Sequence, residues 1–172
     1  MKNHLPYRPI LHLPKTKFEK IVNSIGLFIY GATILFLIVN WGNIPDKVPG
    51  HFNAAGEVDR WGSKYELITL PIIALLLFVI MSLVEKIPHL HNYPDRLNES
   101  NVVQFYTHSR KLLNLVKNIL LVMFSSLSIQ IVRVAQGAID DIGIALVPIF
   151  LIVIFGTVGI GMYKQSKIKY CD

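Results

Sequence analysis

Charged residues are scarce in this chain of 172 residues, where they make up 16% of the sequence. An ordinary soluble domain carries about 25%. Hydrophobic residues reach 52% and the mean hydropathy is +0.47, because several long apolar runs dominate the chain. The composition excludes an ordinary soluble globule and predicts an integral membrane protein made of one compact unit.

Cysteine and the common catalytic motifs are also scarce or missing. The single cysteine, Cys171, excludes an internal disulfide, and no Cys-x-x-Cys pair is present to bind zinc. There is no G-x-S-x-G, no H-E-x-x-H and no phosphate-binding glycine loop. No Asp, Glu or His lies at the centre of an apolar run, where an ion transporter normally carries one. We therefore expect neither a transporter nor an enzyme, and no cofactor or metal.

The apolar runs define the predicted fold class. Each run is long enough to cross a bilayer as a helix. We expect an all-α integral membrane protein with four transmembrane helices and a short β-hairpin-like loop between helices 1 and 2. The helices are predicted at about 21–40, 67–84, 112–132 and 142–163.

These helices predict a single membrane domain over residues 21–163. A segment at 1–20 precedes it and a tail at 164–172 follows it. Within it, polar stretches at 42–66 and 85–111 connect the helices.

Lysine and arginine are concentrated on one side of this arrangement. The N-terminal segment, the 85–111 connection and the tail together carry twelve, whereas the connections on the other side carry four. Because the side rich in Lys and Arg is normally cytoplasmic, we expect both termini inside and the 42–66 loop outside. The net charge of +6 then reflects membrane topology and not nucleic-acid binding. Lys117, inside the third predicted helix, is expected to extend its ammonium back to the lipid headgroups.

The external loop contains the densest run of polar and turn-forming residues. Ala54-Ala55-Gly56 predicts a tight turn in which Gly56 adopts a positive φ. The flanking residues 51–53 and 57–59 should form the arms of a hairpin with a loop of three to five residues. Trp41 and Trp61 are expected at the membrane interface on this face, which would keep the hairpin close to the membrane.

Four polar side chains could converge on one side of the turn: His51, Asn53, Glu57 and Asp59. One histidine with carboxylates and an amide is a poor zinc set, and the spacing is not that of an EF-hand. Asn53 and Asp59 can instead accept hydrogen bonds from backbone N–H groups of the turn. A rigid turn can also be a recognition surface, so the structural and binding interpretations are compatible.

The loop also resembles a known signature, P-D-x-V-P-x-H-F-N-x-x-G-x-x-D-x-x-G-S-K, of the bacterial membrane domain found in SdpI-type proteins. Those proteins are immunity factors against a secreted peptide toxin. The resemblance covers about residues 20–110 and implies a location in the bacterial cytoplasmic membrane and a role in toxin immunity or envelope stress. The matching residues are Pro45, Asp46, Val48, Pro49, His51, Phe52, Asn53, Gly56, Asp59, Gly62, Ser63 and Lys64.

Three functional hypotheses follow. The first is a non-enzymatic protein whose external loop recognises an antimicrobial peptide or another membrane protein. The second is a membrane sensor or regulator that signals through the 85–111 connection. The third is a metal-assisted hydrolase at His51, Glu57 and Asp59. The predicted binding or structural residues of the loop are Pro45, Asp46, Pro49, His51, Phe52, Asn53, Gly56, Asp59, Trp61, Gly62 and Lys64.

Overall fold

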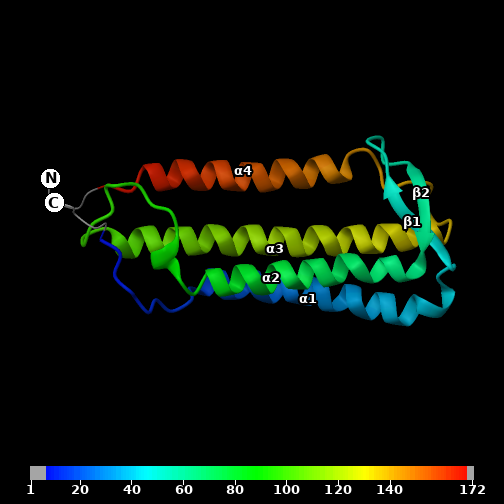
Figure 1. Cartoon of the computed structure of the whole chain (residues 1–172), viewed down its shortest axis with the longest axis horizontal. Coiled ribbons are helices and arrows are strands. Elements are labelled where there is room, and N and C mark those ends of the chain that lie inside the picture. The colour runs from blue at the N-terminus through cyan, green and yellow to red at the C-terminus, as the bar shows by residue number, and fades with distance from the viewer. Residues whose placement is uncertain (1–6, 170–172) are drawn as a thin grey trace.

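The computed structural model describes residues 7–169, which form four long helices and one two-stranded hairpin (Figure 1). Cys171 lies outside the described residues. Four helical segments are long and apolar enough to cross a membrane, which confirms the predicted fold class. The elements are α1 (Lys17–Asn40), β1 (Lys47–Phe52), β2 (Val58–Ser63), α2 (Thr69–Val84), α3 (Val102–Ala135) and α4 (Leu146–Ser166).

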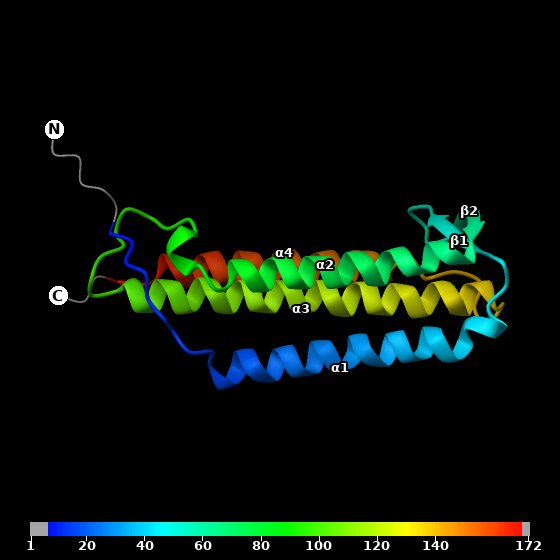
Figure 2. The same ribbon diagram turned by 60° about the horizontal axis from the view of Figure 1, so that its bottom comes forward.

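Helix α3 is the central element, because it packs against each of the other three helices (Figures 1 and 2). It is also the longest helix, with 34 residues, and begins well before the predicted position 112. Helix α4 packs mainly on α3. A methyl group at Gly161 would lie 2.6 Å from the Leu112 side chain, so glycine permits this close approach of α4 to α3.

Several helix ends differ from the predicted ends, and at α1 a polar cap extends the helix beyond the apolar run. Helix α1 begins at Lys17, where Thr16 and Glu19 form a capping box. The 3-10 helix Lys64–Ile68, capped in the same way by Ser63 and Glu66, precedes α2. Helix α4 begins at Leu146 and ends at Ser166, four and three residues later than predicted.

The hairpin lies at one end of the helices, and the segments 7–16 and 85–101 lie at the other end (Figure 1). A small core fixes the hairpin to the helices. Val48 on β1 is fully buried in it, so the hairpin is anchored on the bundle and does not project freely. The buried members of this core are Leu37, Ile44, Val48, Leu67 and Val132.

The opposite end has a second, more aromatic core. Its buried members are Tyr93, Leu97, Val102, Phe105 and Tyr106.

The extended N-terminal segment is tied to this second core. Arg8 donates to the carbonyl oxygen of His91 at 2.8 Å, and the Tyr106 hydroxyl donates to that of Pro9 at 3.2 Å. Burial raises the pKa of Tyr93 to about 12, and its hydroxyl donates to the carbonyl oxygen of Pro88. Segment 7–16 and the 85–101 connection thus pack together as one layer across this end.

Candidate functional site

The turn of the hairpin is built around Asn53. Its side-chain oxygen accepts from the backbone N–H groups of Ala55 and Glu57, at 2.9 and 3.0 Å, and its amide donates to the Glu57 carboxylate at 2.8 Å. Gly56 has a φ of 87° and donates its N–H to the Asn53 carbonyl. The structure therefore confirms the predicted turn, the positive φ of Gly56 and the structural role of Asn53.

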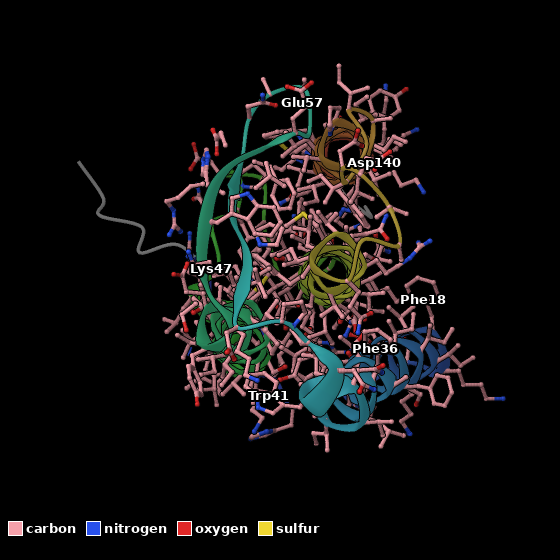
Figure 3. The ribbon with its side chains drawn as sticks, turned by 90° about the vertical axis from the view of Figure 1, so that its right-hand side faces the viewer. Phe18, Phe36, Trp41, Lys47, Glu57 and Asp140 are labelled. Carbon is pink, nitrogen blue, oxygen red and sulfur yellow. The ribbon has the colours of Figure 1, made fainter. Side chains whose placement is uncertain are left out.

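The tip of the hairpin rests on the connection between α3 and α4. A methyl group at Gly56 would lie 3.0 Å from the backbone of Gly143, and the Ile142 N–H donates to the Gly56 carbonyl at 3.3 Å. Viewed from this end of the molecule, the hairpin crosses from α2 toward α4, with Glu57 near the connection that carries Asp140 (Figure 3). Gly56 is therefore needed both for the turn and for this contact.

Asp59 does not have the predicted role of accepting hydrogen bonds from the turn backbone. Its carboxylate instead accepts from Nδ1 of His51 at 2.7 Å, on the solvent-exposed side of the strands. Glu57 is bound to Asn53 and so takes no part in this pair. Among residues 7–169, no group of three or more His, Cys, Asp or Glu side chains could hold a metal ion.

Arg60 connects the two strands to the 3-10 helix and was not singled out from the sequence. Its guanidinium donates to the Glu66 carboxylate at 2.9 Å and to the Gly50 carbonyl at 2.7 Å. The hydrogen bond to Glu66 raises the pKa of Arg60. A side chain at Gly50 would overlap the guanidinium, and one at Gly62 would overlap the Glu66 carboxylate, so both glycines leave room for this pair.

The base of the hairpin is closed by Lys64. Its backbone N–H donates to the Asp46 carbonyl at 2.9 Å, and its ammonium lies 3.5 Å from the Asp46 carboxylate. The same ammonium lies 5.5 Å from the centre of the Trp41 ring, which packs on Tyr65. Trp61, in contrast, is 53% exposed.

A groove of about 420 Å³ lies between the hairpin and helices α2, α3 and α4. Charged or titratable side chains from the hairpin and the 3-10 helix contribute to one side of it, namely His51, Arg60 and Glu66. Its floor is apolar and comes from the helices and the α3–α4 connection. The floor residues are Leu67, Leu70, Leu127, Ile131, Ile142 and Val147.

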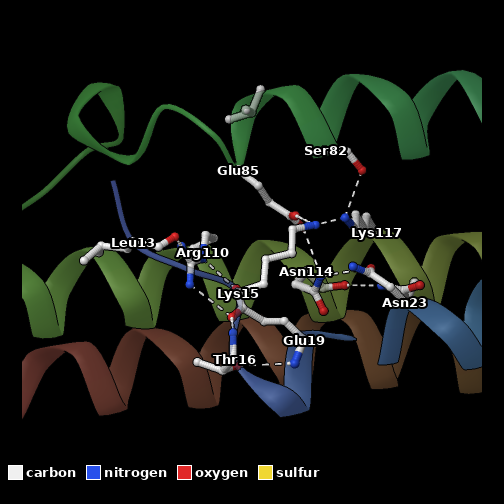
Figure 4. A network of polar contacts seen from close by, with 12 residues as sticks. Leu13, Lys15, Thr16, Glu19, Asn23, Ser82, Glu85, Arg110, Asn114 and Lys117 are labelled. Atoms are coloured by element: carbon white, nitrogen blue, oxygen red, sulfur yellow. Dashed lines mark hydrogen bonds and ion pairs between the residues drawn. The ribbon is translucent and has the colours of Figure 1, made fainter. Parts of the chain in front are cut away.

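A second polar assembly lies toward the opposite end of the helices, and sequence analysis missed it (Figure 4). We call it the buried polar network; it consists of Lys15, Glu19, Asn23, Ser82, Glu85, Arg110, Asn114, Lys117 and Asn118.

In one part of the network, Arg110 of α3 binds α1. The Glu19 carboxylate, fully buried, accepts from Nε and Nη2 of Arg110 at 2.7 and 3.1 Å. Arg110 also donates to the carbonyl oxygens of Leu13 and Pro14. It therefore holds the segment before α1 as well as α1 itself.

In a second part, Lys117 binds α2. Its ammonium lies 2.7 Å from Glu85, donates to the Ser82 hydroxyl at 2.9 Å and lies 4.6 Å from the centre of the Phe78 ring. Lys15 approaches the other Glu85 oxygen at 3.3 Å. The prediction that Lys117 extends to the headgroups is wrong, because Glu85 at the end of α2 offers a buried partner of opposite charge.

Three asparagines complete the network. Asn23 on α1 accepts from the side-chain amides of Asn114 and Asn118 at 3.0 and 2.9 Å. A side chain at Gly26 would overlap the Asn118 amide oxygen, so glycine lets α1 approach α3 here. One feature of the sequence does indicate the network. Four polar residues of α3 fall on one helical face, namely Arg110, Asn114, Lys117 and Asn118.

Comparison with known proteins finds a family match that includes the hairpin. Residues 28–75, which include the hairpin and parts of α1 and α2, match a family described as a domain of unknown function, DUF1648. An uncharacterized protein of Archaeoglobus fulgidus is 30% identical over 87 residues, covering 49% of this chain and 48% of that protein. The chain thus spans about half the length of this relative, and no solved structure matches it. The hairpin and its flanking helices are therefore similar to a domain family whose function is unknown.

Proposed function

We propose that this chain is a non-enzymatic, multi-pass protein of the bacterial cytoplasmic membrane that protects the cell envelope by binding a peptide toxin at its external hairpin. The observation that supports this function best is the groove beneath the hairpin, with its apolar floor and charged side. The resemblance of the loop to SdpI-type immunity proteins suggests the ligand class. The family match, which includes the complete hairpin, supports giving this element the central role.

An amphipathic peptide suits the chemistry of the groove. Apolar side chains of the peptide would cover the floor formed by α2, α3 and α4, which removes apolar surface from water or lipid. Arg60 and His51 would face carboxylate or carbonyl oxygens of the peptide. Because Val48 is buried against the helices and Gly56 contacts the α3–α4 connection, the groove is preformed, and little ordering would oppose binding.

A test in cells fills the groove without changing the hairpin. Val147→Trp places a large ring in the floor, whereas Val153→Trp places the same ring on α4 at a valine that does not line the groove. In a strain sensitive to the toxin of the SdpI-type proteins, wild type and Val153→Trp should protect and Val147→Trp should not. If the toxin kills cells that express the wild-type protein as fast as cells without it, and the protein is present in the membrane at normal abundance, toxin immunity is rejected.

The proposed orientation has its own test, which does not depend on a toxin. With Cys171→Ser as background, Glu57→Cys at the hairpin tip should react with a membrane-impermeant maleimide in intact cells. Asn92→Cys, on the connection at the opposite end, should react only after the membrane is permeabilised. The reverse labelling pattern would contradict an external hairpin.

A sensor that signals through the 85–111 connection is the alternative function. It is favoured by one observation: Glu85 and Arg110, at the two ends of this connection, are bound to Lys117 and Glu19 in the buried polar network. A rearrangement of α1 would reach Arg110 through Glu19, and Glu85 through Lys15, which lies just before α1. The test is cross-linking from Leu90, which is 66% exposed. A soluble regulator that cross-links to this position would favour the sensor function, provided that the cross-link is lost when residues 86–92 are replaced.

A further inference from the structure

A second groove, of about 410 Å³, lies among α1, α3 and α4 toward the end of the molecule opposite the hairpin. Its walls include Phe18, Leu112, Leu115 and Ile160. The charged groups that line it are two lysines, Lys111 on α3 and Lys164 on α4, and no carboxylate of residues 7–169 lines it. The groove therefore combines apolar walls with a charged edge of one sign.

The two lysines lie where the helices change from apolar to polar. Lys111 directly precedes the apolar part of α3, and Lys164 is in the last turn of α4. Phe18, from the first turn of α1, lines the same groove. If these helices cross the membrane as proposed above, both ammonium groups lie at the level of the lipid phosphates, and Leu115 and Ile160 lie deeper, toward the acyl chains.

The two lysines have no carboxylate partner in the part of the chain that the structure describes. Within residues 7–169, neither Lys111 nor Lys164 makes an ion pair, whereas Lys15, Lys64 and Lys117 each do. Their charges are therefore uncompensated by the part of the chain that the structure describes.

The helices on the two sides of the groove are held at a fixed separation. His108 of α3 donates from Nε2 to the Gly161 carbonyl of α4 at 2.8 Å, and Gly161 packs against Leu112. The lysines project from these same turns of α3 and α4. A ligand with a phosphate would thus meet two cations that line the same groove.

We propose that this groove binds an anionic phospholipid. The phosphate lies between Lys111 and Lys164, and an acyl chain follows the apolar wall formed by Leu112, Leu115 and Ile160. A phospholipid with a net negative charge is preferred over a zwitterionic one, because a choline headgroup brings its own cation next to the lysines. This inference rests on the membrane placement proposed above but not on toxin recognition.

The test measures lipid binding to the purified full chain in a neutral detergent by native mass spectrometry. We expect phosphatidylglycerol to bind more tightly than phosphatidylcholine. Lys111→Gln and Lys164→Gln should each weaken phosphatidylglycerol binding about fivefold. The matched control, Lys20→Gln with Lys169→Gln, removes two exposed lysines that do not line the groove and should leave binding unchanged.

A charge-conserving variant separates loss of charge from loss of folding. Lys111→Arg with Lys164→Arg should keep the preference for phosphatidylglycerol. Equal binding of the two lipids, or an equal loss in the control variant, would overturn the proposal. Protection against heat unfolding by inorganic phosphate alone, to the same extent as by phosphatidylglycerol, would also overturn it, because the site would then bind a free anion.

Discussion

The hairpin and the buried polar network are both rich in polar contacts, but they are built differently. The side-chain contacts within the hairpin and at its base join residues at most 18 positions apart, and most of the groups involved are exposed. The contacts between elements of the network join residues 29 to 97 positions apart, and most of the groups involved are buried. The hairpin is therefore a locally determined structure, whereas the network holds separate helices together.

This difference predicts unequal energetic roles. Breaking a buried ion pair by removing one partner typically costs about 3–5 kcal/mol, because the other charge stays buried. Exposed pairs contribute about 0–1 kcal/mol. We infer that the network supplies the helix packing on which the hairpin rests, and that the surface of the hairpin is free to serve recognition.

The largest expected effect is that of Lys117→Met, which among the described residues leaves the buried Glu85 carboxylate with the more exposed Lys15 as its remaining cationic partner. The free energy of unfolding in detergent should fall by about 3–5 kcal/mol. Adding Glu85→Gln should restore a large part of the loss, since the unpaired charge is then removed. A loss below about 1 kcal/mol for Lys117→Met would remove the contrast with the exposed pairs of the hairpin.

A smaller effect is expected where α1 meets the network. Gly26→Ala introduces a methyl group that overlaps Asn118, and overpacking of this kind costs about 1–3 kcal/mol. Gly31→Ala, in the same helix, meets no atom within 4 Å and should be neutral or stabilising, because alanine favours helices. Equal stability of the two variants would contradict the close approach of α1 to α3.

In the hairpin, Gly56→Ala should cost more stability than Gly137→Ala. Both glycines have a positive φ, so each substitution should cost about 1–2 kcal/mol of backbone strain. Only Gly56 also contacts another backbone, that of Gly143, whereas Gly137 has open space around it. Thermal unfolding of the two variants measures the difference. If they unfold at the same temperature, the hairpin tip does not rest on the α3–α4 connection.

The smallest effect is expected for the exposed pair of His51 and Asp59. Their side chains are 65% and 43% exposed, so Asp59→Asn should change the free energy of unfolding by less than about 1 kcal/mol. Denaturation of the purified variant beside the wild type provides the measurement. A loss as large as that of Lys117→Met would mean that the hairpin surface is structural.

The same contrast explains what could be predicted from the sequence. The turn at Gly56 and the role of Asn53 depend on neighbours within a few residues, so the local pattern contains them. The fold class followed from apolar runs long enough to span a membrane. The convergence of His51 with Asp59 was expected, but their separation from the Asn53–Glu57 pair was not, because the side-chain direction across the bulged pairing of β1 and β2 is not evident from spacing.

The buried polar network could not be predicted in the same way. The pattern of α3 indicates how far Lys117 lies from a helix end, but it does not identify the residue that faces it from another helix. Glu85 looked like the polar end of an apolar run, and Glu19 like one acid in a basic segment. Only the packing of α1 and α2 on α3 shows that these carboxylates meet Arg110 and Lys117.

The most direct test of the central claim, that the groove under the hairpin is the recognition site, is photo-cross-linking to the toxin in living cells. A photoreactive amino acid replaces Val147 in the floor of the groove or, as the control, Val153 on the same helix outside it. We expect a covalent adduct with the toxin from position 147 and none from position 153. No adduct from position 147, or equal adducts from both positions, would contradict it.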